Sequence, residues 1–230
     1  MIRRGRDPGL DHPWWIVGVA VVAGLGSWLI ARRRPVPVWE LDLTTWLNGA
    51  PDLAATALGP VMQVGMLGAP LVLAVVILAV RRDWLLSAAV VVGGLLAWFG
   101  AKVVKDAVAR GRPAVFLPDI DVREPSAHGY GYLSGHSAVS MFTMVVVMAL
   151  LPQRGRPVAL VVAGLVGVAR IVYGVHLPAD VVGGWAFGAD VVGGWAFGAI
   201  VGVGTIAAVT RLRPDGAGAS ARPGRSAGRL

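Results

Sequence analysis

Apolar residues occur in long runs along the chain, and short polar stretches separate these runs. The runs cover 14–31, 60–80, 84–104, 136–151, 157–173 and 179–209. A membrane-spanning helix needs about 20 mostly apolar residues, and each run reaches or approaches that length. The pattern therefore predicts an all-α, polytopic membrane protein built as a six-transmembrane-helix bundle.

The two ends of the chain differ from the apolar runs. Residues 1–13 are expected to form a cytoplasmic N-terminal tail, and the first run has no obvious small-residue cleavage site after it, so we interpret it as an uncleaved anchor. Residues 211–230 are rich in Gly, Ala, Pro and Arg, which favours a disordered basic cytoplasmic tail. The membrane domain is thus predicted to cover 14–210.

The distribution of Lys and Arg predicts the orientation of the bundle. Basic residues in the short inner loops and in both tails favour cytoplasmic ends, although Arg32–Arg34 then lie on the outer side. In this orientation the polar segments 105–135 and 174–179 both face outward. We therefore expect a multi-pass protein of the cell membrane whose unusual polar residues gather on the extracytoplasmic side.

Composition supports the membrane assignment and excludes several other classes. Hydrophobic residues make up 56% of the chain and charged residues 15%, against about 45–50% and about 25% in soluble domains. The net charge of +8 lies mainly in loops and tails, where it can contact anionic membrane lipids. No basic face or aromatic stacking module suggests a nucleic-acid partner. The absence of cysteine from the sequence excludes disulfides and thiol catalysis.

The first candidate for chemistry is the stretch KDAVARGRP. Lys105 and Arg112 are seven residues apart, so on a helix they return to within about 20° of the same face. Pro113 then discourages continuation of the helix. Two cations at a helix end can hold a polyanion. The alternative is that both side chains only extend toward water from the membrane boundary.

The second candidate is YLSGHS. Gly135 permits close approach of the backbone, and Ser134 supplies a hydroxyl group. His136 starts an apolar run, where the free N–H groups of a helix N-terminus favour an anion. A histidine in this place can protonate a leaving group at neutral pH. The alternative is that Ser134 is a simple helix cap.

The third candidate is ARIVYGVHLPAD. Arg170 is expected in the last turn of a helix that stops at Gly174, and Pro178 suits the first turn of the next helix. His176 and Asp180 are four residues apart. The carboxylate can accept a hydrogen bond from one imidazole nitrogen and leave the other as a nucleophile. The alternative is that the two groups only satisfy each other at the membrane boundary.

The decapeptide ADVVGGWAFG occurs twice in succession, so Asp180 has a duplicate at Asp190. Along a continuous helix Asp190 lies about 15 Å further on and about 80° away around the axis. Only Asp180 has the four-residue spacing from His176, and we therefore assign the function to Asp180. In the alternative, residues 190–210 span the membrane alone and the first copy loops outward, which places Asp190 at the boundary.

Together the three candidates place cations, two histidines, a Gly-Ser turn and a carboxylate on one membrane face. This inventory suits phosphoryl transfer through a phosphohistidine, in which cations and backbone amides bind the phosphate oxygens while the histidines serve as nucleophile and acid. Other acidic and imidazole groups of the same loop have no zinc-like or EF-hand spacing. We therefore expect no metal and no cofactor. The groups in question are Asp119, Asp121, Glu124 and His128.

The order Lys-x6-Arg-Pro, Ser-Gly-His and Arg-x5-His-x3-Asp resembles the type 2 phosphatidic acid phosphatase (PAP2) superfamily, over roughly residues 60–210. The resemblance implies a six-helix, metal-independent membrane lipid phosphatase. Two positions depart from the family pattern, with Leu133 in place of the usual proline and Ala169 in place of the usual serine. The implied phosphate-binding residues are Lys105, Arg112, Ser134, Gly135 and Arg170, and the implied catalytic residues are His176 as nucleophile, Asp180 as its orienting partner and His136 as general acid.

The expected activity is hydrolysis of a lipid phosphate monoester or pyrophosphate in the membrane. On resemblance, the candidate substrates are phosphatidic acid, phosphatidylglycerol phosphate and polyprenyl (pyro)phosphates. Two alternatives use the same residues. One is a phosphotransferase with an alcohol acceptor, and the other is a non-catalytic lipid-phosphate binder or transporter. The sequence indicates neither the lipid nor the oligomeric state.

Overall fold

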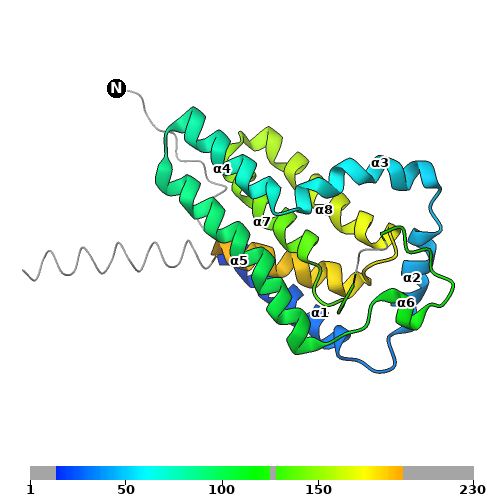
Figure 1. Ribbon diagram of the computed structural model, residues 1–230. Helices are drawn as coiled ribbons and strands as arrows, with labels where there is room; N and C mark the ends of the chain where they lie inside the picture. Colours follow the sequence, from blue (N-terminus) through cyan, green and yellow to red (C-terminus); the bar gives the residue numbers. More distant parts are fainter. Residues whose placement is uncertain (1–13, 125–127, 194–230) are drawn as a thin grey trace, which may run out of the picture. The chain divides into compact units, whose positions relative to one another are not determined.

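The computed structural model describes residues 14–124 and 128–193, and every regular element in these ranges is helical (Figure 1). The all-α prediction is thus confirmed for this part of the chain. The last helix of the described residues covers 178–193. The elements before it are α1 (Trp14–Ala31), α2 (Val38–Asn48), α3 (Asp52–Met62), η1 (Gln63–Gly65), α4 (Gly68–Arg81), α5 (Trp84–Val108), α6 (Pro113–Phe116), α7 (Gly135–Leu150), η2 (Gln153–Gly155) and α8 (Arg156–Val172).

The second apolar run is not the single straight helix that its length suggests. It is divided between α3 and α4, whose axes are bent by 59° at a short break. The 3-10 turn η1 follows α3, and Met66 then has an extended backbone (φ −82°, ψ 154°). Pro60, two residues before the end of α3, lacks the N–H needed for a regular helical ladder. The break places η1 directly against α7.

Among the described residues, two helical segments are long and apolar enough to cross a membrane, Trp84–Phe116 and Gln153–Val172, and the bent pair of α3 and α4 can supply a third. Val17–Ala31 and α7 are apolar but shorter. The described residues therefore support a helical membrane protein with two to three candidate spans, and the predicted count of six is not confirmed. The predicted tails, 1–13 and 211–230, and the end of the run 179–209 lie outside the described residues.

Helix α7 packs between α5 and α8, and α4 packs on α5 (Figure 1). The centre of this packing is a buried apolar cluster that includes Ile77, Val90, Val139 and Phe142. Gly93 allows the close approach, since a Cβ there would lie 2.3 Å from Cζ of Phe142. Such small-residue contacts are typical of helix packing in membranes.

The short helix α2 was not predicted, because its 11 residues mix tryptophans with polar groups. Its last residue, Asn48, is buried and ties α2 to two distant segments. The Asn48 amide nitrogen donates to the carbonyl oxygens of Asp121 (2.8 Å) and Val172 (2.9 Å), and its oxygen accepts from the Asp121 N–H (2.9 Å). Helix α2 is therefore held beside the end of α8, where the third sequence candidate begins.

Candidate active site

A cavity of about 520 Å³ lies where α5, α7, α8 and the segment before α7 meet. All the predicted cations and both predicted histidines line it, together with Gly135. Ser134 and Asp180 are fully buried and are not part of the lining. The lining residues are Trp98, Ala101, Lys102, Lys105, Asp106, Arg112, Glu124, His128, Gly129, Tyr130, Gly135, His136, Arg170 and His176.

Lys105 and Arg112 reach this cavity by a route that differs from the predicted one. Helix α5 ends at Val108, because Ala109 adopts a left-handed conformation with φ 50°. Arg112 is therefore not on the face of α5, and the prediction of two cations stacked on one helix is wrong in this respect. Arg112 instead immediately precedes α6, whose first residue is Pro113.

Backbone carbonyl oxygens hold both of these cations in place. Lys105 Nζ has two such acceptors, and the Arg112 guanidinium has three. The acceptors are Tyr130 and Gly131, at 3.1 and 3.2 Å from Lys105, and Gly129, Val175 and His128, at 3.1, 2.9 and 3.0 Å from Nε, Nη1 and Nη2 of Arg112. The segment before α7 and the turn after α8 thus fix the direction of both positive charges.

Arg170 lies in the last turn of α8, as predicted, and its side chain is 3% exposed. The Glu124 carboxylate contacts both terminal nitrogens of Arg170, Oε2 with Nη1 and Oε1 with Nη2, the second at 3.4 Å. A two-point contact of this kind is the geometry in which a guanidinium binds carboxylate or phosphate. Glu124 therefore occupies the edge of Arg170 that can bind an anion. The sequence analysis considered Glu124 only as a possible metal ligand.

His136 is the second residue of α7, and Ser134 is the N-cap of that helix. The Ser134 hydroxyl accepts from the Ser137 N–H at 3.4 Å, so the simple capping interpretation of Ser134 matches its observed contact. The His136 ring packs edge-on against Trp98, with the ring centroids 6.0 Å apart. Gly135 and His136 bring the helix N-terminus, which favours anions, to the cavity.

The bend between α3 and α4 has a direct contact with His136. A Cβ built on Gly65 would lie 2.8 Å from both Cβ and the carbonyl oxygen of His136. We expect Gly65→Ala to shift His136 and to lower the turnover of the proposed reaction by roughly 10–100-fold. Gly68→Ala is the matched control, because nothing lies within 4 Å of its added Cβ. Equal turnover in the two variants would show that the position of His136 does not depend on Gly65.

His176 lies in the turn between α8 and the last helix, and Gly174 makes this turn with φ 68°. His176 is 2% exposed, and its Nδ1 is 3.5 Å from Oδ2 of Asp180. Burial, reinforced by the positive charges of Lys105 and Arg170, lowers the pKa of His176 well below its ordinary value. The imidazole is therefore neutral at physiological pH, which is the form in which a ring nitrogen can act as a nucleophile.

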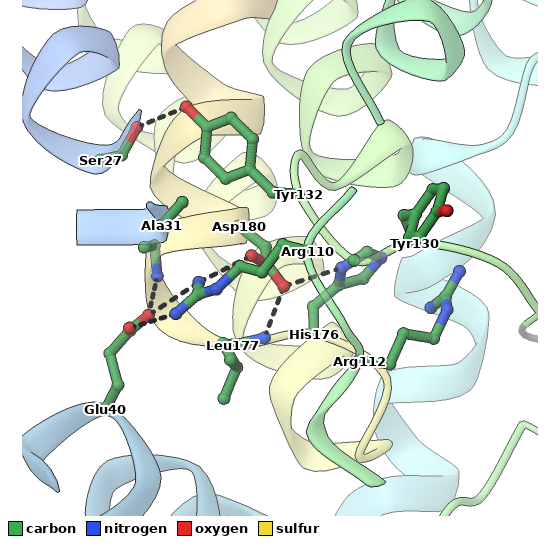
Figure 2. A network of polar contacts seen from close by, with 12 residues as sticks. Ser27, Ala31, Glu40, Arg110, Arg112, Tyr130, Tyr132, His176, Leu177 and Asp180 are labelled. Atoms are coloured by element: carbon green, nitrogen blue, oxygen red, sulfur yellow. Dashed lines mark hydrogen bonds and ion pairs between the residues drawn. The ribbon is translucent and has the colours of Figure 1, made fainter. Parts of the chain in front are cut away.

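The Asp180 carboxylate has a separate donor for each oxygen (Figure 2). Oδ2 accepts from the Leu177 N–H at 2.9 Å and faces His176, and Oδ1 accepts from Arg110 Nη1 at 2.9 Å. The helix over 178–193 is continuous through the start of the second decapeptide. The arrangement in which the first copy loops outward is therefore not the observed one, and Asp180 rather than Asp190 is the partner of His176.

Sequence reasoning missed two buried charged residues, Arg110 and Glu40, both with 0% exposed side chains. Arg110 Nη2 is 2.5 Å from Glu40 Oε2, and Arg110 also binds Asp180. The sequence contained a signal for both residues, because charged residues within apolar membrane segments are rare and usually functional. Arg110 lies between Lys105 and Arg112, the two cations to which the sequence analysis gave a role, and Glu40 lies between Trp39 and Leu41.

The loop residues that were weighed as possible metal ligands do not form a metal site. Asp121 contacts Nε of Arg123 at 3.0 Å, and His128 lines the cavity. Within 14–124 and 128–193, no three His, Asp or Glu side chains gather in a way that could hold a metal ion. Leu133 and Ala169, which depart from the family pattern, are buried and do not line the cavity.

Comparison with known proteins shows to which family this chain is similar. The PAP2 superfamily model matches residues 83–214, which include all three sequence candidates. No curated protein is significantly similar to the chain in sequence. Two solved structures are similar in fold. One is the transmembrane PAP2 type phosphatidylglycerolphosphate phosphatase from Bacillus subtilis, with a TM-score of 0.64 at 20% identity over 76% of this chain and 91% of that one.

The other is Aquifex aeolicus LpxE, with a TM-score of 0.60 at 22% identity over 66% of this chain and 90% of that one. At these identities the likeness concerns the fold, and the match of the family model concerns the sequence. Since that match covers more than half of the chain, the chain belongs to the PAP2 superfamily and is a PAP2-type phosphatase by family, as its three motifs indicated.

Proposed function

We propose that this protein is an integral membrane lipid phosphatase that hydrolyses a lipid phosphate monoester or pyrophosphate through a phosphohistidine intermediate. The observation that carries the proposal is the convergence of three cations and two histidines on one cavity. The fold it shares with a structure named as a phosphatidylglycerolphosphate phosphatase supports a lipid substrate. The proposal needs neither a metal nor a cofactor.

Substrate binding begins with the phosphate group. Lys105 of α5, Arg112 just before α6 and Arg170 of α8 supply positive charge to the cavity, and the N-terminus of α7 at Gly135 supplies backbone N–H groups. The phosphate takes the place that the carboxylate of Glu124 holds on Arg170. The cavity volume, about 520 Å³, lies within the range of sites for small organic ligands, so it also has room for part of the lipid head group.

The first chemical step is attack by His176 on phosphorus. Nδ1 faces Asp180, so Nε2 is the nitrogen that forms the N–P bond while the P–O bond to the lipid alcohol breaks. The negative charge of the bound phosphate favours the protonated form of His136, and this imidazolium gives its proton to the departing oxygen. Asp180 stabilises the positive charge that develops on the imidazole of His176 and holds the ring in one orientation.

The second step releases phosphate. His136, now neutral, takes a proton from water while the water oxygen attacks phosphorus and the N–P bond to His176 breaks. Inorganic phosphate leaves and both histidines return to their starting protonation states. If an alcohol replaces water in this step, the same site transfers the phosphoryl group, which is the second candidate function.

Phosphate release from detergent-solubilised protein tests the proposal. We expect release from at least one lipid among phosphatidic acid, phosphatidylglycerol phosphate and polyprenyl (pyro)phosphates, unchanged by a chelator and absent in His176→Ala. Release only after addition of an alcohol acceptor would indicate the transferase, and binding without release would indicate a carrier. Loss of activity with the chelator would contradict the metal-free reaction.

The proposed site faces the extracytoplasmic side of the cell membrane, and single cysteines can test this because the natural chain has none. We expect Asp119→Cys, in the exposed segment after α6, to react with a membrane-impermeant maleimide on intact cells. Arg82→Cys, in the exposed turn between α4 and α5, should react only after permeabilisation. The reverse pattern would place the site on the cytoplasmic side.

A further inference from the structure

A chain of buried charges runs from α2 to the candidate nucleophile (Figure 2). Glu40, Arg110 and Asp180 have 0% exposed side chains and come from three distant parts of the sequence. Arg110 lies between the two carboxylates, with Nη2 2.5 Å from Glu40 Oε2 and Nη1 2.9 Å from Asp180 Oδ1. We propose that Glu40 and Arg110 are a positioning pair that fixes the Asp180 carboxylate against His176.

The inference rests on the proposed function, because it gives the pair a role in the phosphohistidine reaction. Neither Glu40 nor Arg110 lines the cavity. They therefore act through Asp180 and not on the substrate. The Asp180 backbone carbonyl oxygen accepts from the Ser134 N–H at 2.8 Å, but its carboxylate, which Arg110 binds, faces His176. The effect of the pair on catalysis is therefore expected to pass through the contact between the carboxylate and His176.

Arg110 controls both the charge and the orientation of Asp180. A carboxylate buried without a partner is strongly disfavoured and takes up a proton or turns away. Arg110 supplies the compensating charge on Oδ1, which leaves Oδ2 for the Leu177 N–H and for His176. Rotation of the carboxylate would break the contact with Arg110 and the contact with Leu177 together, so the two donors define one orientation.

Glu40 in turn fixes Arg110 and the helix that carries Asp180. Glu40 Oε1 accepts from the backbone N–H of Ala179 at 2.8 Å and lies 3.3 Å from Arg110 Nη1. Ala179 is in the first turn of the helix over 178–193, next to Asp180. One carboxylate therefore binds a free N–H at the start of this helix and the guanidinium that directs the Asp180 side chain.

A purely structural ion pair is the competing explanation, and replacing the whole pair distinguishes the two. Replacing both residues removes the Glu40 charge together with Arg110, and Asp180 can then become neutral by taking up a proton, so apolar residues of similar size can be accommodated. We expect Glu40→Leu combined with Arg110→Met to fold, to keep KM near the wild-type value and to lose about 100-fold in kcat. A folded double variant with wild-type kcat would overturn the inference.

The near-isosteric Glu40→Gln gives a second test if the double variant does not fold. Its amide can still accept from Ala179, but one oxygen facing Arg110 becomes an N–H donor. We expect kcat to fall by about tenfold with KM unchanged. Unchanged kcat would contradict the role of Glu40. Ser27→Ala is the matched control, because it removes a buried contact (Ser27 Oγ to Tyr132 OH, 3.0 Å) that does not involve Asp180.

A double-mutant cycle shows whether Arg110 acts through Asp180. In the wild-type background Arg110→Met should lower kcat about 100-fold, whereas in the Asp180→Asn background it should cost about threefold or less. Equal losses in both backgrounds would mean that Arg110 acts elsewhere.

The wild-type protein and His176→Ala separate failure of this inference from failure of the proposed function. A wild-type protein that releases no phosphate, or a His176→Ala protein that keeps the wild-type rate, overturns the proposed function and this inference with it. The inference alone is overturned if the wild type is active, His176→Ala is inactive, and Arg110→Met lowers kcat by the same factor in the wild-type and Asp180→Asn backgrounds.

Discussion

His176→Ala is expected to lower kcat on the order of 10⁴-fold or more, because it removes the atom that forms the bond to phosphorus. Substrate binding should change little, since Lys105, Arg112 and Arg170 remain. Folding should also be retained, because the main chain of this turn keeps its own contacts, such as the bond from Arg112 Nη1 to the Val175 carbonyl at 2.9 Å. The measurement is phosphate release from the solubilised protein, together with binding of the unreacted lipid.

Detection of the phosphohistidine intermediate tests directly whether His176 is the nucleophile. With an aryl phosphate, whose leaving group needs no proton, His136→Gln should still form the phosphohistidine but hydrolyse it slowly. An acid-labile phosphoprotein should then accumulate in His136→Gln and be absent when His176→Ala is added. A phosphoprotein that survives in the protein lacking His176 would assign the nucleophile to another residue.

Asp180→Asn is expected to lower kcat by about 10³–10⁴-fold, as loss of the orienting carboxylate does in comparable histidine sites. Asparagine retains the shape of the side chain, but it cannot neutralise the imidazolium, and its NH2 group cannot accept from one of the two donors, Arg110 and Leu177, that bind the carboxylate. The effect should fall on kcat rather than on KM, because Asp180 does not line the cavity.

Asp190→Asn is the internal control that the duplicated decapeptide offers. The two aspartates have the same neighbours in sequence, ADVVGGWAFG in both copies, but only Asp180 contacts His176. We expect turnover of Asp190→Asn to remain close to that of the wild type. The opposite ranking of the two variants would assign the pairing to the second copy.

Several features of the fold could be predicted from the sequence because they depend on local properties. Apolar runs of sufficient length form helices that bury their backbone groups in lipid, and helices occur at each of the six runs, although their number of spans is not confirmed. The caps at Ser134 and Gly174 were also predictable, since both depend on residue types next to the helix end.

Other features could not be predicted because they depend on contacts between distant segments. The bend before α4 is decided by the packing of η1 on α7. The position of Arg112 follows from the end of α5 at Val108, where Ala109 adopts a left-handed conformation. Pro113 predicted that the helix ends, but not that it ends before Arg112. Glu40 lies 70 residues before its partner Arg110, and nothing in its own neighbourhood indicated that contact.

The helical membrane class, the family and the residue types of the candidate site could be predicted from the amino-acid order, because hydropathy and motif spacing are properties of the chain alone. The folded chain was needed to see that Glu124 contacts Arg170, that Ser134 is buried and does not line the cavity, and that Glu40 and Arg110 hold Asp180. The physical reason is that a buried charge must find its partner in space, and that partner can lie anywhere in the sequence.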